Sequence, residues 1–171
     1  MDFLLDRLPR TEYDIFVDAS TSSGIGGCCG KFYFKMSWTS LMRMRIQVDG
    51  VARMELLSAL VSILCFEDLI ARKLVRLYID NENAYSWLKK SRSSNIQGTR
   101  FLAMWEFGKH RAECKVRPIW LPSEHNVTAD ALSRGTVPKW LKRHGVRRRL
   151  SRRQVEVLIN NPVKTCLNVL K

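Results

Sequence analysis

The sequence predicts one α/β domain built on a five-stranded mixed sheet with helices on both faces. Three observations lead to this fold class. Short apolar runs separated by glycines open the chain, a long apolar helix follows them, and two later apolar runs each come after a helix. Because a strand–helix–strand crossover lays its two strands side by side and parallel, we expect three antiparallel strands first and two parallel strands added to them.

Glycine turns mark the N-terminal strands. Residues 1–12 are expected to be a leader or linker, and residues 13–19 form the first strand. Four glycines between positions 24 and 30 punctuate two further short strands, around 25–29 and 31–38. Connections this short join antiparallel neighbours, so the three strands predict a meander.

Helices and strands alternate after the meander. The stretch from Val51 to about Ala71 is apolar almost all round, which predicts a deeply buried helix. The elements after it are a strand at 74–79, helices near 82–90 and 97–113, and a strand at 115–121. Pro118 places that last strand at an edge of the sheet. The segment "HNVTADALSR" then forms a short helix, which we expect Asn126 to cap.

Positive charge is concentrated at the C-terminal end of the chain. The formal net charge is +13 and the pI is about 10.0. Residues 139–171 hold 10 Lys/Arg against one acid, whereas residues 1–138 hold 19 against 15. A pI this high favours a polyanionic partner, chiefly nucleic acid, over a merely solubilising surface. We expect a domain at 13–138 followed by a basic tail at 139–171.

The most basic part of this tail is "KWLKRHGVRRRLSRR", residues 139–153. It can act as an arm that grips phosphates, as a nuclear-import signal, or as a solvated linker to a following domain. In the first case the contacts come from Lys139, Lys142, Arg143, Arg147, Arg148, Arg149, Arg152 and Arg153.

Several protein classes are excluded. The five cysteines show no metal-ligand spacing, and their odd number indicates a reducing compartment. Asp2 and Asp6 occupy the place of a basic signal-peptide region, and Glu67 and Asp68 interrupt the leucine-rich stretch. We therefore expect an intracellular protein without a membrane partner, located in the cytoplasm, and in the nucleus if the tail is an import signal.

Two predicted strands each end on an acid. Asp18 follows "IFV" and Asp80 follows "LYI". Because parallel neighbours lie ~4.8 Å apart, the two carboxylates would meet at one edge of the sheet. That edge, at the carboxyl ends of the strands, is where ligands bind in open sheets. Asp14, ~13 Å back along the first strand, belongs to the other end.

Two further acids are candidates for the same site. Glu55 is the only charge between Met54 and Phe66, and a buried carboxylate is costly unless it is paired or bound to metal. Asp130 lies in the first turn of the last helix. For both, the alternative is a favourable interaction with the helix dipole. Four carboxylates without His or Cys ligands favour Mg²⁺ or Mn²⁺, and two such ions can assist phosphodiester hydrolysis.

Four segments resemble, in order, the four motifs of the ribonuclease H family. They are "IFVDAS", "RMELLSAL", "LYIDNENA" and "NVTADALSR", and the resemblance covers about residues 13–135. They look most like the domain attached to reverse transcriptases of gypsy- and DIRS-type retroelements. The resemblance implies a ribonuclease H-like fold and maps the family's catalytic, metal-binding carboxylates to Asp18, Glu55, Asp80 and Asp130.

This resemblance implies endonucleolytic cleavage of the RNA strand of an RNA–DNA hybrid by a two-metal mechanism. The ions would be two Mg²⁺, with Mn²⁺ as a substitute, and a polymerase domain in the same polyprotein would be a partner. Substrate hydrogen bonds are expected from Ser20, Thr21, Asn83 and Asn126, which border the site. Ser20 and Thr21 can instead satisfy the turn after the first strand.

The sequence departs from cellular members of the family in two places. Trp120 stands where they carry a loop histidine, and His125 fits that position poorly but can stand in for it. A basic, tryptophan-rich helical insertion is missing around 90–97. The main alternative function is therefore a catalytically weak module that binds nucleic acid or tethers a retroelement polyprotein. A transposase or integrase core is disfavoured, because its acids end on a Glu in a longer helix.

Overall fold

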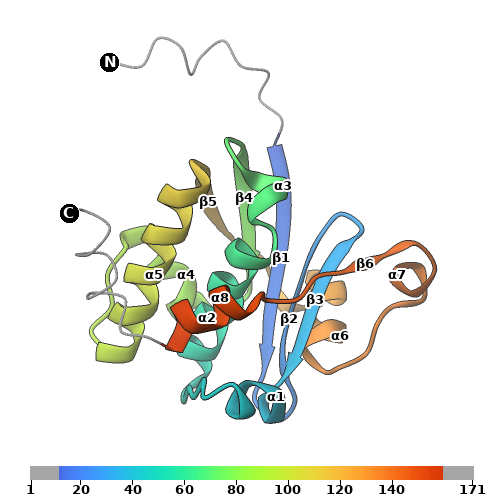
Figure 1. The fold of residues 1–171 in the computed structure, drawn as a ribbon, viewed down its shortest axis with the longest axis horizontal. Coiled ribbons are helices and arrows are strands. Elements are labelled where there is room, and N and C mark those ends of the chain that lie inside the picture. The colour runs from blue at the N-terminus through green and yellow to red at the C-terminus, as the bar shows by residue number, and fades with distance from the viewer. Residues whose placement is uncertain (1–11, 160–171) are drawn as a thin grey trace.

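The computed structural model describes residues 12–159, which form a six-stranded mixed sheet flanked by helices (Figure 1). Most of the predicted leader, and tail residues 160–171, lie outside the described residues. The strands are β1 (Glu12–Ser20), β2 (Gly24–Cys29), β3 (Phe32–Ser37), β4 (Leu74–Ile79), β5 (Lys115–Trp120) and β6 (Val146–Arg147). Their order in the sheet is β5-β4-β1-β2-β3-β6.

Five of these strands confirm the predicted topology. β1, β2 and β3 form the antiparallel meander, β4 pairs with β1 in parallel, and β5 pairs with β4 in parallel. β5, which contains Pro118, is an edge strand as predicted. The α/β class with a mixed sheet is therefore confirmed.

The predicted strand count of five is wrong, because the basic tail contributes β6. This strand pairs in parallel with β3, with Val146 opposite Phe32 and Arg147 opposite Tyr33. Backbone hydrogen bonds run from Val146 N to Lys31 O at 2.9 Å and from Arg148 N to Tyr33 O at 2.7 Å. The arginine-rich sequence shows no apolar alternation, but a two-residue edge strand needs only backbone bonds to form.

The helices within residues 13–138 agree with the prediction except in two places, and the basic tail adds α7 and α8. They are α1 (Trp38–Arg43), α2 (Val51–Cys65), α3 (Glu67–Ile70), α4 (Glu82–Lys90), α5 (Ile96–Ala112), the 3-10 turn η2 (Ser123–His125), α6 (Val127–Ser133), α7 (Lys139–His144) and α8 (Arg152–Ile159). α1 was not predicted. The helix expected to continue to Ala71 ends at Cys65, and the short α3 follows after Phe66.

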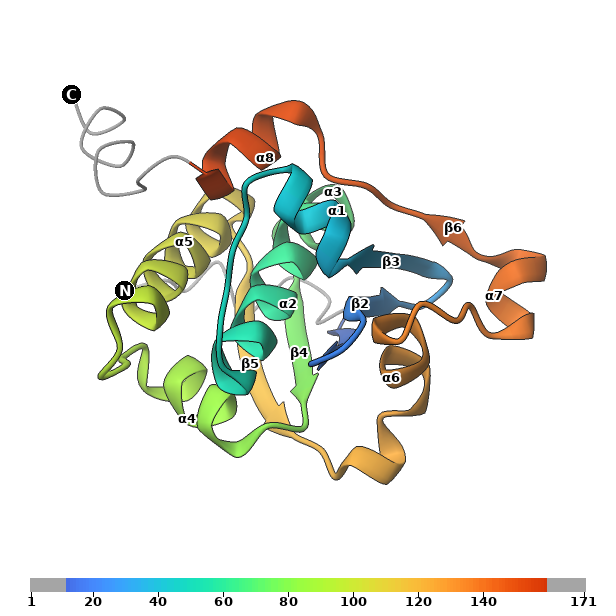
Figure 2. The same cartoon turned by 90° about the horizontal axis from the view of Figure 1, so that it is seen from below.

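Helices cover both faces of the sheet, as predicted (Figure 2). Along β1, Ile15 and Val17 join the main core, which contains most of α2, whereas Phe16 packs in a smaller cluster with Leu132 of α6. Alternate residues of a strand point to opposite faces, so α2 and α6 lie on opposite sides of β1. Gly26 permits the close approach of α6, because a Cβ there would lie 2.5 Å from that of Leu132.

The tail packs onto the sheet and the core as far as residue 159. Leu141 of α7 and Leu158 of α8 are buried, in the smaller and the main cluster respectively. Gln154 Nε2 donates to Leu64 O at the end of α2, at 2.7 Å. Whether residues 13–138 form a domain without these contacts stays a prediction.

In residues 12–159, no helix combines the length and the apolar composition that crossing a bilayer requires.

Candidate active site

The parallel pairing of β1 and β4 brings the first two predicted acids together. The register pairs Phe16 with Tyr78, so Asp18 and Asp80, two residues further on, lie at the same edge of the sheet. α2 adds Glu55, whose Oε1 accepts a hydrogen bond from Ala19 N at 3.1 Å. One carboxylate oxygen from each of Asp18, Glu55 and Asp80 lies within 4.8 Å of the others. We call these three side chains the acidic triad.

Burial and mutual repulsion disfavour full ionisation of the acidic triad. Burial, followed by the charges of Asp80 and Asp130, raises the pKa of Asp18 to about 6, although Ser133 opposes the rise. Burial, then Asp18 and Asp80, holds the pKa of Glu55 well above its usual range. The pKa of Asp80 is also raised, chiefly by burial. Such a cluster is suited to a ligand that supplies positive charge.

The donor atoms of the triad fit a hard divalent cation. All are carboxylate oxygens, which Mg²⁺ and Mn²⁺ prefer over softer ligands. Glu55 is only 2% exposed, and its Oε2 has no hydrogen-bond partner among the described residues. A buried polar atom without a partner is costly, and coordination of a cation would satisfy it.

Asp130 lies beside the acidic triad but is not one of its members. Its charge contributes to the raised pKa of both Asp18 and Asp80, so it is close enough to act on them. Its Oδ1 accepts from Arg134 Nε at 3.0 Å, one helical turn further along the chain. The predicted catalytic role of Asp130 stays a prediction.

One polar side chain of α6 and one that directly precedes it hold the helix against β1. Ser133, which is buried, donates from its hydroxyl to Asp18 Oδ2 at 2.5 Å. Asn126 Nδ2 donates to Val17 O at 2.9 Å. Asn126 occupies the N-cap position of α6, as expected, but its side chain makes no capping hydrogen bond and bonds to β1 instead. The side chain of an N-cap residue can bond to a neighbouring strand where helix and strand lie close.

Sequence reasoning gave no role to Ser133 or to Trp120 next to this site. Ser133 is three residues after Asp130 on a helix, so the two share a face, and that spacing was a signal. The indole Nε1 of Trp120 donates to Asp80 O at 3.1 Å. This contact joins the end of β5 to the end of β4, and no local pattern indicates it.

The predicted substrate-binding residues lie in different environments. Ser20 is largely buried, with its hydroxyl 3.3 Å from that of Ser22, which agrees with the turn-satisfying alternative. Thr21 and Asn83 are exposed, whereas Asn126 is buried. His125 is exposed in η2. Contacts of any of these residues with substrate stay predictions.

The eight cations of the proposed arm belong to ordered elements rather than to one extended segment. The helices α7 and α8 carry Lys139, Lys142, Arg143, Arg152 and Arg153, and β6 with the two residues after it carries Arg147, Arg148 and Arg149. Arg148 is already engaged, because it donates to both carboxylate oxygens of Asp68 at 3.0 Å. The role of these cations in nucleic-acid binding stays a prediction.

Comparison with known proteins identifies the fold. No protein-family model matches the sequence, and no curated protein matches it. Among solved structures, the chain is similar to RNase H1 of the halophilic archaeon Halobacterium salinarum, with a TM-score of 0.53 and 12% identity over 71% of this chain and 93% of that one. It is also similar to LC11-RNase H1 from a compost metagenome, with a TM-score of 0.50 and 17% identity over 76% of this chain and 98% of that one. The domain therefore has the ribonuclease H fold.

Proposed function

We propose that the chain is an endonuclease that cleaves the RNA strand of RNA–DNA hybrids, as the ribonuclease H part of a retroelement reverse transcriptase. The acidic triad is the observation that carries this proposal. It stands at the carboxyl ends of two central parallel strands of a ribonuclease H fold, where such sheets bind ligands. The retroelement context rests on the motif resemblance of "LYIDNENA" and "NVTADALSR".

The side chains that would hold divalent cations are Asp18, Glu55 and Asp80, with Asp130 as a ligand at the rim. Two Mg²⁺ ions bound there would supply an activated water and stabilise the leaving oxygen of a phosphodiester. Ser133 orients the carboxylate of Asp18, and Asn126 keeps the start of α6 against β1, so that Asp130 stays beside the triad. These contacts pre-organise the ligand set before the substrate arrives.

Substrate choice rests on features that distinguish RNA from DNA. The 2′-hydroxyls of a hybrid are exposed in its wide, shallow minor groove, and polar side chains near the cut can read them. Thr21 and Asn83 are exposed and are available for such contacts. The net charge of +13 favours the phosphates of both strands. A polymerase domain in the same polyprotein would deliver the hybrid.

The test is cleavage of an end-labelled RNA–DNA hybrid beside a DNA duplex of the same sequence. We expect Mg²⁺ or Mn²⁺ to support cleavage of the hybrid only, with a 5′-phosphate and a 3′-hydroxyl as products. Ca²⁺ accepts longer, looser ligand shells and should support none. Asp18→Asn should bind the hybrid without cutting it, and Glu124→Gln, an exposed acid outside the triad, should cut normally.

Two results would contradict the proposal. Cleavage in the presence of a chelator would exclude the triad as a metal site. Hybrid binding without cleavage under every metal condition would favour the alternative of a tether module.

A further inference from the structure

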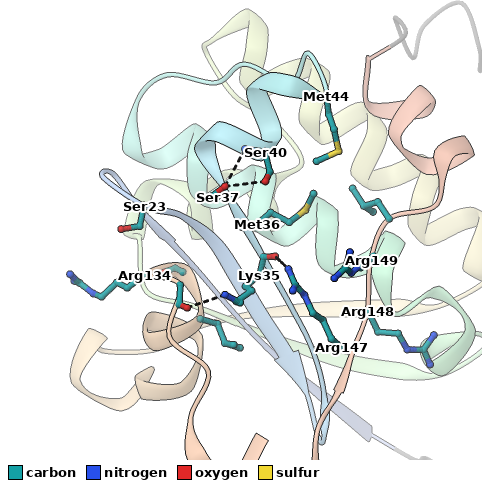
Figure 3. A pocket seen from close by; sticks show the side chains of 14 residues that line it. Ser23, Lys35, Met36, Ser37, Ser40, Met44, Arg134, Arg147, Arg148 and Arg149 are labelled. Carbon is teal, nitrogen blue, oxygen red and sulfur yellow. Dashed lines mark hydrogen bonds between the residues drawn. The ribbon is translucent and has the colours of Figure 1, made fainter. Parts of the chain in front are cut away.

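A basic groove of about 490 Å³ lies between β3, α1, the end of α6 and the segment that contains β6 (Figure 3). The cations that line it are Lys35, Arg134, Arg147, Arg148 and Arg149. The groove is also lined by the hydroxyl groups of Ser37 and Ser40, and none of its lining residues within 12–159 is an acid.

Three of these cations are not neutralised by acids among the described residues. Lys35 Nζ donates to Gly135 O at 3.0 Å, and Arg147 Nη2 donates to Lys35 O at 3.2 Å. Within residues 12–159, neither of these two side chains nor Arg149 forms an ion pair. Cations held together in this way repel one another, so an anion in the groove would stabilise the arrangement.

The basic tail builds one wall of this groove, and Arg148 anchors that wall. Arg148 points away from Lys35 in Figure 3. Its guanidinium donates three hydrogen bonds to Asp68 of α3 and lies 4.8 Å from the centre of the Phe32 ring. Alternate residues of an extended segment point in opposite directions, which leaves Arg147 and Arg149 for the groove. Side-chain contacts thus hold this wall against the fold.

The groove adjoins the candidate active site through two consecutive residues. Ser133 lines the groove and donates to Asp18 of the acidic triad. Arg134 lines the groove and pairs with Asp130. A strand that lies in the groove would therefore pass directly to the carboxylates.

We propose that this groove binds the sugar–phosphate backbone of the nucleic-acid strand that passes the acidic triad, with Lys35, Arg147 and Arg149 on successive phosphates. This inference rests on the proposed function, since it assigns the groove to the substrate of that site. Contacts of this kind position a duplex without reading its sequence. An acidic peptide is the other occupant that such charges would accept.

The first test is the salt dependence of hybrid binding, measured in the Asp18→Asn background so that no cleavage occurs. A plot of log affinity against log salt concentration has a negative slope, and each phosphate contact adds about 0.7–0.9 to its magnitude. Below, a lower slope means a smaller magnitude. We expect the triple variant Lys35→Gln, Arg147→Gln, Arg149→Gln to lower this slope by about 2–3. Arg149→Gln alone, which breaks no hydrogen bond within residues 12–159, should lower it by about 1 and guards against misfolding of the triple variant.

Two comparison variants separate the groove from net charge. The first is the triple variant Arg100→Gln, Lys115→Gln, Arg117→Gln. It removes three exposed cations from α5 and β5, at the far side of the sheet from β6, and should leave the slope almost unchanged. The second is the triple variant Lys139→Gln, Lys142→Gln, Arg143→Gln. It removes three cations from α7 and should lower the slope less than the triple groove variant does. Equal slopes for the α7 and groove variants would mean a diffuse arm and would overturn the proposal.

The remaining outcomes distinguish this proposal from the proposed function. If the unmodified chain fails to cleave hybrids but the groove variants weaken hybrid binding, the groove stands and the nuclease proposal fails. If cleavage occurs while the groove variants bind with an unchanged slope, the groove proposal fails alone. A competition experiment tests the acidic-peptide alternative. If polyglutamate displaces labelled hybrid from the unmodified chain as effectively as unlabelled hybrid does, the groove belongs to acidic peptides and the proposal is overturned.

Discussion

The carboxylates of the acidic triad lower the stability of the metal-free fold when they are ionised, which is the form that binds a cation. Asp18 and Glu55 are 5% and 2% exposed, and both have raised pKa values. An acid that is harder to ionise in the folded state than in the unfolded chain costs stability once the pH ionises it. A bound cation would remove this cost, so stability, pH and metal binding should be coupled at this site.

The pH dependence of metal-free stability follows from Asp18. Its pKa is about 6 in the folded state against 3.8 ordinarily, so the folded state holds the proton more tightly and stability falls as the pH rises between these values. Above pH 6 the full penalty is on the order of 3 kcal/mol. Urea unfolding in chelator at pH 5 and pH 7.5 measures this, and Mg²⁺ should restore stability at pH 7.5.

Matched variants assign this pH effect to the triad. Asp18→Asn should lose much of the pH dependence and be more stable than the parent at pH 7.5 in chelator. Glu124→Gln should keep the parent's dependence, because Glu124 is exposed and outside the triad. A parent protein that becomes more stable from pH 5 to pH 7.5 without metal would contradict the expectation.

Ser133→Ala should weaken metal activation while leaving the fold intact. The hydroxyl donates to Asp18 Oδ2 at 2.5 Å and holds the orientation of that carboxylate. Loss of such a supporting contact typically reduces metal affinity by about 10–100-fold. The measurement is the Mg²⁺ concentration that gives half-maximal activity. Ser62→Ala, which removes a buried hydroxyl bonded to Ala59 O on α2, is the control and should leave it unchanged.

At the scale of secondary structure, the strand β6 depends on contacts outside the sheet. It contains two residues, pairs only with β3, and its register is supported by the Arg148–Asp68 pair. A strand this short is not stable through its ladder alone. The position of the groove wall therefore depends in part on the contact of Arg148 with α3.

Arg148→Gln should loosen β6 without unfolding the domain. A partly exposed ion pair contributes up to about 1 kcal/mol, so the global midpoint should change little. Hydrogen exchange of the Val146 and Arg148 amides, which bond to Lys31 O and Tyr33 O, should become faster. Arg152→Gln breaks an exposed pair with Glu156 on α8 and is the control. Equal exchange in both variants would show that Arg148 does not anchor the strand.

At the scale of the whole molecule, the basic tail contributes residues to both hydrophobic clusters that pack against the sheet. Leu141 lies in the smaller cluster and Leu158 in the main one, so the C-terminal segment closes both faces of the sheet. Removal of a buried leucine side chain typically costs about 2–5 kcal/mol. The tail is therefore expected to contribute to folding as well as to charge.

Ending the chain after Pro138 should lower its stability by several kcal/mol, because both buried leucines and the β6 pairing are lost. The free energy of unfolding in urea measures this, with a chain ended after Ile159 as the control. A chain of residues 1–138 with unchanged stability would instead support a domain boundary at 138. Point variants of the groove avoid this complication, which is why the binding test uses them.

The strands, most helices and the triad acids could be predicted because each leaves a local pattern. Short apolar runs mark β1 to β5, and an acid directly after such a run marks Asp18 and Asp80. Glu55 was identifiable because a single charge interrupts an apolar helix. These patterns arise from burial, which acts on each segment separately. The parallel pairing of β1 with β4 followed from the crossover rule.

What no local pattern contains is the set of contacts between segments far apart in the chain. β6 is a strand only because β3 offers an unpaired edge, and Asn126 bonds to Val17 only because α6 packs against β1. Lys35 and Arg147 meet across 112 positions of sequence, so the groove that they line exists only in the folded chain. Composition and periodicity specify which residues are buried or charged, whereas the packing of distant elements decides which of them become neighbours.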